Sequence, residues 1–351
     1  MKLRNFGFRG IVKDFIKSYL TNRKKYVDLN GFKSNLNDMN FGVPQGSVLG
    51  PLLFNIFIDD FSRIDFNCKT ILYADDSVFY VSDVSFEGCI EKLNNMITVI
   101  STWLVNNRIL ANTLKTKLMF ISSKQVRLLP EIRLNGSVLE WVTHFKYLGF
   151  YIDDKLNFSF HSKYVYNNLS RLHGMIYSVS RVLPKHTLFS LYNSLIIPII
   201  TQNVIIWGGI SKNNTDPISI KINKILRLIL NIGYNENRIP NVSTNFMYKE
   251  IRYLKFKDVY RFHLLKFLHH ALYVDYSFFD SYFSPLLPNH NYPFRNVRIN
   301  LPYTRLQIGK NFTIFRVCDL INEIPEELLA QQSKASLKRK FYEYAIAKYT
   351  D

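Results

Sequence analysis

The chain has 351 residues, of which 45 are Lys or Arg and 27 are Asp or Glu, so its formal net charge is +18. Because 47% of the residues are hydrophobic, the chain can bury a sizeable core and is not globally disordered. The basic excess, together with 22 Tyr and 28 Phe, favours a nucleic-acid partner over a membrane surface, since no long basic amphipathic helix stands out.

The cysteines and the apolar segments indicate the compartment. Cys68, Cys89 and Cys318 are too widely spaced for a zinc motif or a disulfide framework, which indicates a reducing environment. Residues 1–5 lack the apolar core of a signal peptide, and the most apolar stretch, 195–210, contains polar residues and is too short to span a bilayer. We therefore expect a soluble protein of the cytoplasm or nucleus, without membrane contact.

Hydrophobic periodicity predicts the elements of the first 110 residues. Apolar residues at helical spacing predict helices over 8–20, 48–61 and 84–107. A hairpin with an Asn30-Gly31 turn follows the first helix, and residues 71–80 predict a second hairpin.

The pattern changes in the rest of the chain. Strand-like segments occupy 117–122, 132–139 and 145–152, and a helical pattern then extends over 158–232. Residues after about 235 are rich in Tyr, Phe and His, and their pattern defines no architecture. The order of elements predicts an α+β domain followed by an α domain.

The second hairpin contains an adjacent pair of carboxylates, Asp75 and Asp76, at its predicted turn. Two like charges side by side are unfavourable unless a cation shares the site, so the pair is a candidate site for a divalent metal. An ordinary Asp-Asp turn on a solvated hairpin explains the same residues. The chain's other such pair, Asp59-Asp60, indicates only the end of a helix.

Three motifs in order resolve this ambiguity. They are Gly42-Val43-Pro44-Gln45-Gly46-Ser47-Val48-Leu49-Gly50-Pro51, Tyr73-Ala74-Asp75-Asp76 and Phe145-Lys146-Tyr147-Leu148-Gly149. Their order and spacing resemble the reverse transcriptases of non-LTR (LINE-type) retrotransposons, in particular the jockey-like group. The resemblance covers most of residues 1–235. Group II intron maturases share parts of the pattern, but Gly46 to Pro51 fit the LINE-type sequence better.

The resemblance implies RNA-directed DNA synthesis on a right-hand polymerase fold. Its expected parts are a partial palm over 1–153, with an antiparallel sheet and packed helices, a helical thumb over 154–235 and a C-terminal extension over 236–351. The expected partners are an RNA template, a DNA primer or target DNA, and deoxynucleotides. The family chemistry uses two Mg²⁺ ions, which would activate the primer 3′-hydroxyl and neutralise the leaving pyrophosphate.

The resemblance also assigns roles to residues. Asp75 and Asp76 correspond to metal-binding catalytic carboxylates, and Lys115 to a residue that neutralises or protonates pyrophosphate, with Lys117 as a competitor for that role. A template- and nucleotide-binding loop comprises Pro44, Gln45, Gly46 and Ser47. The primer grip comprises Tyr147, Leu148 and Gly149. In the thumb, the candidate phosphate contacts are Lys163, Arg171, Arg181 and Lys185, whereas Trp207 fits a core position.

Parts of the family pattern are not found in this sequence. A further metal-binding aspartate of the family lies in a Phe-Asp segment upstream of the residues that Lys2 to Gly7 resemble, and the fingers precede it. We therefore expect an N-terminally truncated polymerase whose metal site is incomplete, with little or no activity alone. The alternatives are a non-catalytic nucleic-acid-binding remnant of a retroelement and an unexpressed pseudogene. The translation of a pseudogene would expose an apolar sheet face and aggregate. The pattern does not define the oligomeric state.

Overall fold

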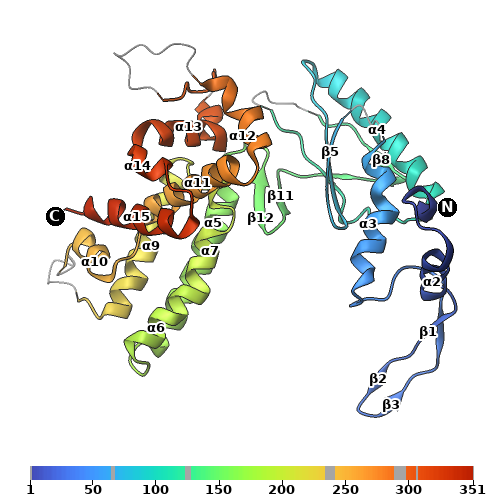
Figure 1. The fold of residues 1–351 in the computed structure, drawn as a ribbon, viewed down its shortest axis with the longest axis horizontal. Coiled ribbons are helices and arrows are strands. Elements are labelled where there is room, and N and C mark those ends of the chain that lie inside the picture. The colour runs from blue at the N-terminus through green and yellow to red at the C-terminus, as the bar shows by residue number, and fades with distance from the viewer. Residues whose placement is uncertain are drawn as a thin grey trace. The chain divides into compact units, whose positions relative to one another are not determined.

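The computed structural model describes residues 2–64, 68–122, 128–233, 242–287, 298–305 and 307–350. It contains both helices and strands, in agreement with the predicted α+β class (Figure 1). The chain divides into two compact units: Met1–Lys117 with Leu128–Glu140, and Leu118–Arg127 with Trp141–Asp351. Among the described residues, no helix is both long and apolar enough to cross a membrane.

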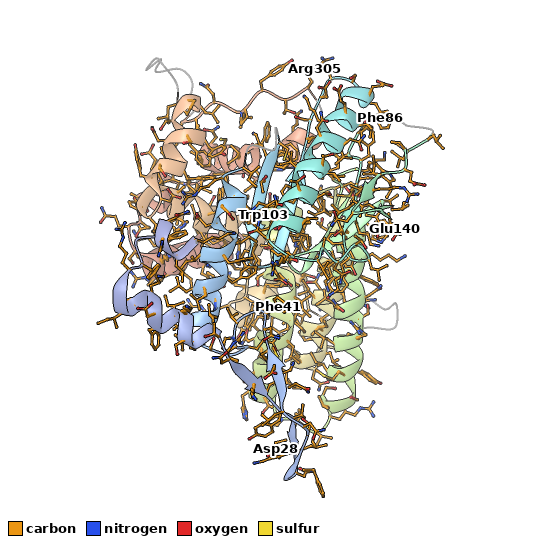
Figure 2. All side chains as sticks on the ribbon, turned by 90° about the vertical axis from the view of Figure 1, so that its right-hand side faces the viewer. Asp28, Phe41, Phe86, Trp103, Glu140 and Arg305 are labelled. Carbon is orange, nitrogen blue, oxygen red and sulfur yellow. The ribbon has the colours of Figure 1, made fainter. Side chains whose placement is uncertain are left out.

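The first unit begins with two helices and a projecting β-hairpin arm. The helices are α1 (Lys2–Asn5) and α2 (Gly10–Leu20), so the predicted helix over 8–20 is confirmed from Gly10 onward. In the arm, β1 (Arg23–Lys25) pairs with β4 (Asn37–Met39), and β2 (Asp28–Leu29) pairs with β3 (Phe32–Lys33). Figure 2 shows Asp28 at the far end of this arm.

The core of the first unit lies between two helices and the aspartate hairpin. The helices are α3 (Leu49–Ser62) and α4 (Phe86–Asn106), and the hairpin pairs β5 (Lys69–Tyr73) with β6 (Asp76–Tyr80). Phe61 of α3 packs against Trp103 of α4 with ring centroids 4.4 Å apart, and against Phe79 of β6 at 5.6 Å. The predicted helices over 48–61 and 84–107 and the hairpin over 71–80 are thus confirmed.

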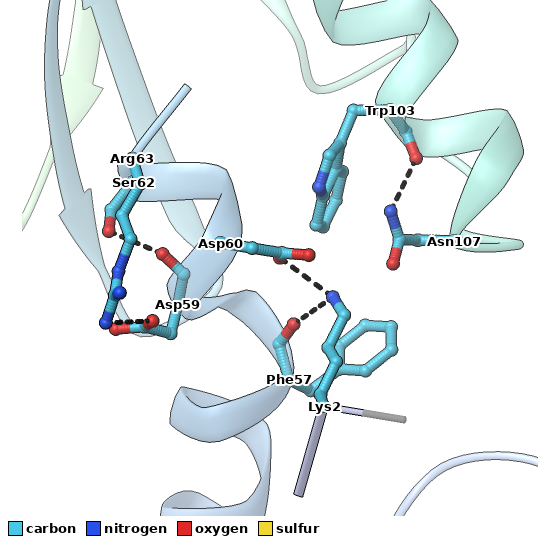
Figure 3. Close-up of polar contacts among 8 residues, drawn as sticks. All are labelled: Lys2, Phe57, Asp59, Asp60, Ser62, Arg63, Trp103 and Asn107. Carbon is cyan, nitrogen blue, oxygen red and sulfur yellow. Dashed lines mark hydrogen bonds and ion pairs between the residues drawn. The ribbon is translucent and has the colours of Figure 1, made fainter. Parts of the chain in front are cut away.

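Ion pairs fix the end of α3, as Figure 3 shows. Lys2 Nζ lies 2.8 Å from Asp60 Oδ1, also donates to the carbonyl oxygen of Phe57, and sits over the Phe57 and Trp103 rings. Asp59 Oδ2 lies 2.6 Å from Arg63 Nη2. Asp59 and Asp60 therefore stabilise a helix end, as predicted.

The remaining strands are short. β8 (Arg133–Leu134) pairs with β9 (Ser137–Val138) around an Asn135-Gly136 turn. The strand predicted over 117–122 is regular only at β7 (Lys117–Leu118), and the division between the units falls within β7 and β10 (Glu140–Trp141). In the described parts of the chain each strand pairs with one other strand, so these residues form no sheet wider than two strands.

The second unit opens with a hairpin and continues as helices. The hairpin pairs β11 (His144–Tyr147) with β12 (Phe150–Asp153). The helical pattern predicted over 158–232 is confirmed as α5 (Ser159–Val179), α6 (Lys185–Leu191), the π-helical turn η1 (Tyr192–Ile196), α7 (Ile197–Thr201), α8 (Val204–Trp207) and α9 (Lys212–Leu230).

The C-terminal residues, which the sequence pattern left undefined, are also helical. The elements are α10 (Thr244–Ile251), α11 (Phe256–Tyr273), α12 (Tyr276–Tyr282), η2 (Ser284–Leu286), η3 (Gln307–Asn311), α13 (Thr313–Glu323), α14 (Glu326–Leu329) and α15 (Lys334–Ala347). Their buried side chains join those of α5–α9 in one hydrophobic cluster that extends from Phe150 to Tyr349. The C-terminal helices therefore share a core with the helices before them.

Trp207 shows how the two helical regions pack together. Its side chain is fully buried and its ring stacks on Phe256 of α11 at 5.5 Å, which confirms its predicted core position. A Cβ atom on Gly209 would overlap the hydroxyl of Tyr260, so the tight contact with α11 requires glycine there. Arg316 of α13 donates to the Gly209 carbonyl oxygen at 3.0 Å.

Candidate active site

The two aspartates lie at the tip of the β5–β6 hairpin. Tyr73 pairs with Asp76, so Ala74 and Asp75 form a two-residue turn in which Ala74 has a φ of +52°. That left-handed conformation disfavours large or β-branched side chains. Both carboxylates are exposed, and neither forms an ion pair within the described part of the chain. The turn thus presents two uncompensated negative charges to solvent.

The hairpin face that carries Asp76 is apolar and uncovered. Side chains directly opposite each other in an antiparallel pair share a face, so Tyr73 and Asp76 share theirs with Ile71 and Tyr80. Ile71 is 52% exposed, Tyr73 62% and Tyr80 47%. The opposite face carries Phe79, which packs on α3. This face of the hairpin therefore presents exposed apolar and aromatic side chains beside Asp76.

The donor set at this turn fits only part of a metal site. The reverse-transcriptase chemistry implied by the motifs uses divalent metal ions, and carboxylate oxygens are suitable ligands for Mg²⁺. Within the described residues, however, no group of three or more His, Cys, Asp or Glu side chains is placed to hold a metal. Asp75 and Asp76 can supply ligands to a cation but do not surround one.

The Pro-Gln-Gly loop is a compact turn that leads into α3. Gly46 has a φ of +78°, which only glycine adopts without strain. The Ser47 hydroxyl donates to the Pro44 carbonyl oxygen at 2.7 Å and accepts from the backbone N–H of Gly50 at 3.1 Å. Ser47 thus caps the helix, whereas the Gln45 side chain is exposed. A Cβ atom on Gly50 would crowd the Ser47 hydroxyl, which explains the third glycine of the motif.

Arg23 of β1 supports this loop from the arm, a role that the sequence pattern did not reveal. Its Nη2 donates to the carbonyl oxygens of Phe41 at 3.1 Å and Gly42 at 2.6 Å, and its Nε donates to Leu20 at the end of α2. One guanidinium therefore joins the end of α2, the base of the arm and the start of the loop. No local pattern in the sequence indicated these contacts.

The two candidate lysines differ in their surroundings. Lys117 Nζ lies 2.5 Å from Glu140 Oε2 and is thus neutralised by a carboxylate. Lys115 is exposed, and its side chain forms no ion pair with a described residue; only its backbone N–H is bonded, to Asn112. Lys115 is therefore the lysine whose charge is available to an anionic ligand.

The predicted primer grip is the turn of the β11–β12 hairpin, in the second unit. Leu148 and Gly149 have φ values of +45° and +87°, as in a type I′ turn. A Cβ atom on Gly149 would overlap the side-chain amide nitrogen of Gln202. The backbone carbonyl oxygen of Gln202 accepts from the indole N–H of Trp207. Gln202, the residue that follows α7, thus lies against the turn, and no local sequence pattern indicated this contact.

His161 of α5 contacts the same hairpin. Its Nδ1 accepts from the backbone N–H of Tyr151 at 3.3 Å, and its ring packs edge-on against Trp207 at 5.0 Å. Burial, reinforced by the Lys146 ammonium, lowers the pKa of His161 to about 4. The imidazole is therefore neutral near pH 7, which its role as an acceptor requires.

The four predicted phosphate contacts all lie on the surface of the second unit. Lys163 and Lys185 are exposed, and Arg181 lies over the Tyr177 ring at 6.0 Å. Arg171 is exposed and its Nη2 donates to Asn168. The predicted site residues are thus divided between the units: those up to Lys115 belong to the first, and Tyr147 onward to the second.

Comparison with known proteins identifies the class to which these features belong. Residues 1–152 match the family described as reverse transcriptase (RNA-dependent DNA polymerase). This segment contains both the Pro-Gln-Gly loop and the aspartate turn. Residues 1–152 are therefore similar to the reverse transcriptases, a family of nucleotidyltransferases that uses divalent metal ions.

The individual relatives identify the branch. Over 227 residues the chain is 27% identical to the RNA-directed DNA polymerase from mobile element jockey of Drosophila melanogaster, covering 61% of this chain and 24% of that protein. Over 231 residues it is 28% identical to the probable RNA-directed DNA polymerase from transposon BS of the same organism, covering 62% and 25%. These relatives support a jockey-like non-LTR retrotransposon reverse transcriptase, and the chain spans about a quarter of their length.

Proposed function

We propose that the chain is the palm and thumb portion of an RNA-directed DNA polymerase that extends a primer 3′-hydroxyl along an RNA template. The observation that carries this proposal is the pair of exposed, uncompensated carboxylates at the β5–β6 turn, within the reverse-transcriptase segment. In this assignment residues 1–153 are a partial palm, 154–235 a thumb and 236–351 a C-terminal extension. The chain would act in the cytoplasm or nucleus.

The residues have distinct proposed roles. Asp75 and Asp76 hold divalent metal, which when bound supplies charge neutralisation at the reacting phosphate. Lys115 offers its unpaired charge to the departing pyrophosphate. The loop of Pro44, Gln45, Gly46 and Ser47 contacts the template base and the incoming deoxynucleotide. The turn of Tyr147, Leu148 and Gly149 positions the primer strand.

The proposal includes low activity for this chain alone. A two-metal site needs more ligands than one turn supplies, and the described residues contain no further carboxylate grouped with Asp75 and Asp76. We expect primer extension on an RNA template to show no template-dependent incorporation above background. Incorporation comparable to that of a longer relative would contradict this expectation.

Metal binding tests the aspartate turn directly. Titration with Mn²⁺, followed by electron paramagnetic resonance, should show a weak site that Asp75→Asn or Asp76→Asn removes. The matched control is Asp59→Asn, which changes the other adjacent pair, where Arg63 and Lys2 already compensate the charges. If Asp59→Asn weakened Mn²⁺ binding as much as Asp75→Asn, the metal assignment would be wrong.

A non-catalytic nucleic-acid-binding remnant is the second candidate function. The observation that favours it is the combination of a net charge of +18 with an incomplete donor set at Asp75 and Asp76. Such a protein would bind RNA and DNA through phosphate contacts, and its affinity would fall with salt. Mn²⁺ binding that requires both aspartates would favour the polymerase assignment; an Asp75→Asn variant with no change in any metal-dependent property would favour the remnant.

A further inference from the structure

The C-terminal helix α15 has one buried row and three outward rows of side chains. Leu337, Phe341 and Ala345 are buried at positions four residues apart, and they face the core of the second unit. The other rows carry the polar residues of the segment. These are Lys334, Lys338 and Tyr342 in one row, Arg339 and Glu343 in the next, and Lys340, Tyr344 and Lys348 in the third.

The outward rows hold five cations and one carboxylate. None of Lys334, Lys338, Arg339, Lys340 and Lys348 forms an ion pair with a residue that the structure describes. Some cations of other elements do have such partners, for example Lys92 with Asp83 and Arg261 with Glu323. Like charges concentrated on one helix repel one another and lower its stability. Binding of an external anion would remove this repulsion.

Aromatic rings accompany the cations. Lys338 Nζ lies 5.7 Å from the centroid of the Tyr342 ring, and Lys348 Nζ lies 4.0 Å from that of Tyr344. Both rings are half-buried against the core of the second unit, so these two cations lie over rings that are themselves anchored.

Tyr349 fixes the C-terminal end of α15 to the rest of the second unit. It is buried, donates to Asp258 Oδ2 at 2.7 Å and accepts from the backbone N–H of Lys255 at 2.9 Å. The cations are thus presented on an anchored helix of 14 residues, roughly 21 Å long, so binding would not have to order the backbone.

We propose that the outward rows of α15 form a surface that binds the phosphate backbone of nucleic acid, separate from the aspartate turn. Repeated cations along the helix match a polymer with repeated anionic charge. An anionic membrane fits less well, because the apolar row is already buried and no large apolar side chain of α15 is exposed. The proposal extends the function proposed above without requiring catalysis.

The test is the salt dependence of binding by the full chain. Fluorescence anisotropy with labelled 20-nucleotide RNA, single-stranded DNA and an RNA–DNA duplex, between 50 and 300 mM KCl, gives the slope of log affinity against log salt. The variant Lys338→Ala/Lys340→Ala/Lys348→Ala should lower the magnitude of this slope by about 2–3 and weaken binding roughly 10- to 100-fold at 150 mM salt. The three probes distinguish an RNA source of the phosphates from a DNA source.

A control variant isolates the contribution of the α15 cations. Lys92→Ala removes a cation that already has a carboxylate partner and should leave the slope unchanged. The polymerase assignment is tested by Mn²⁺ binding at the aspartate turn and not by this slope, so the two proposals can fail independently. An unchanged slope in the triple lysine variant, or binding to phosphatidylserine vesicles without binding to any nucleic-acid probe, would overturn the proposal. Circular dichroism should show that the triple variant keeps its helix content.

Discussion

His161 makes the stability of the second unit depend on pH. Burial holds its pKa at about 4 in the folded chain, against 6.5 for a solvated histidine. Between these values the unfolded state binds a proton that the folded state does not, so stability should fall as pH drops from about 7 to 4. His263, whose pKa burial likewise lowers to about 4, acts in the same direction.

We expect urea unfolding at pH 7.0 and pH 5.0 to differ by on the order of 1–3 kcal/mol. His161→Asn keeps an acceptor for the Tyr151 N–H but does not titrate. The difference in unfolding free energy between pH 7.0 and pH 5.0 should therefore be smaller in this variant, and the contribution of His263 to that difference should remain. Equal pH dependence in the parent chain and His161→Asn would show that the buried imidazole does not control it.

At the same scale, local sequence patterns distinguish two aspartate pairs that look alike. Asp59-Asp60 lies within an apolar stretch at helical spacing, and Asp75-Asp76 between two β-prone runs, so local patterns placed one on α3 and the other on a turn. His161, Gln202 and Arg23 could not be found this way. Their contacts depend on segments brought together by the fold, and no local period records such contacts.

At the scale of elements, the Tyr349 hydroxyl fixes α15 to the start of α11. Burial, and next the Asp258 carboxylate, raise the pKa of Tyr349, so the hydroxyl stays protonated and donates. Tyr349→Phe would leave the Lys255 N–H and the Asp258 carboxylate without this partner. We expect a loss of about 1–3 kcal/mol in the free energy of unfolding, measured in urea by circular dichroism.

Tyr344→Phe is the matched control, since its hydroxyl accepts from the side chain of Lys348 at the surface. It should change stability by less than about 0.5 kcal/mol. Asp258→Asn combined with Tyr349→Phe should cost less than the sum of the single changes, because both remove the same bond. Additive losses would mean that the Tyr349–Asp258 contact contributes nothing.

The elements also show where sequence patterns fail. The helices α2 and α4 have an apolar face and a polar face, and periodicity predicted both. By contrast, α11 is buried around most of its circumference, at Phe256, Val259, Phe262, Leu265 and Leu268 among others. Such a helix has no polar face to produce a period, which is why periodicity did not predict α11.

At the scale of the whole molecule, the shared core of the second unit predicts that the proposed thumb cannot fold without the C-terminal extension. A variant that ends at Gly233 would lack Phe256, Tyr260 and the rest of α10–α15. It would expose Ile200, Val204 and Trp207, each of which is at most 1% exposed in the full chain. Exposing three such side chains costs about 5–9 kcal/mol, comparable to the whole stability of a typical domain.

We therefore expect the variant 1–233 to bind 8-anilinonaphthalene-1-sulfonate strongly and to lack a cooperative urea transition for its second unit. The variant 141–351 retains both halves of the core and should unfold cooperatively, which makes it the matched control. If 1–233 instead gave a cooperative transition with dispersed side-chain NMR signals from Trp207, residues 154–235 would be an independent domain. The contacts of α11 with α7 and α8 would then be a docking interface between two folded parts, because neither part would need the other's side chains to complete its core.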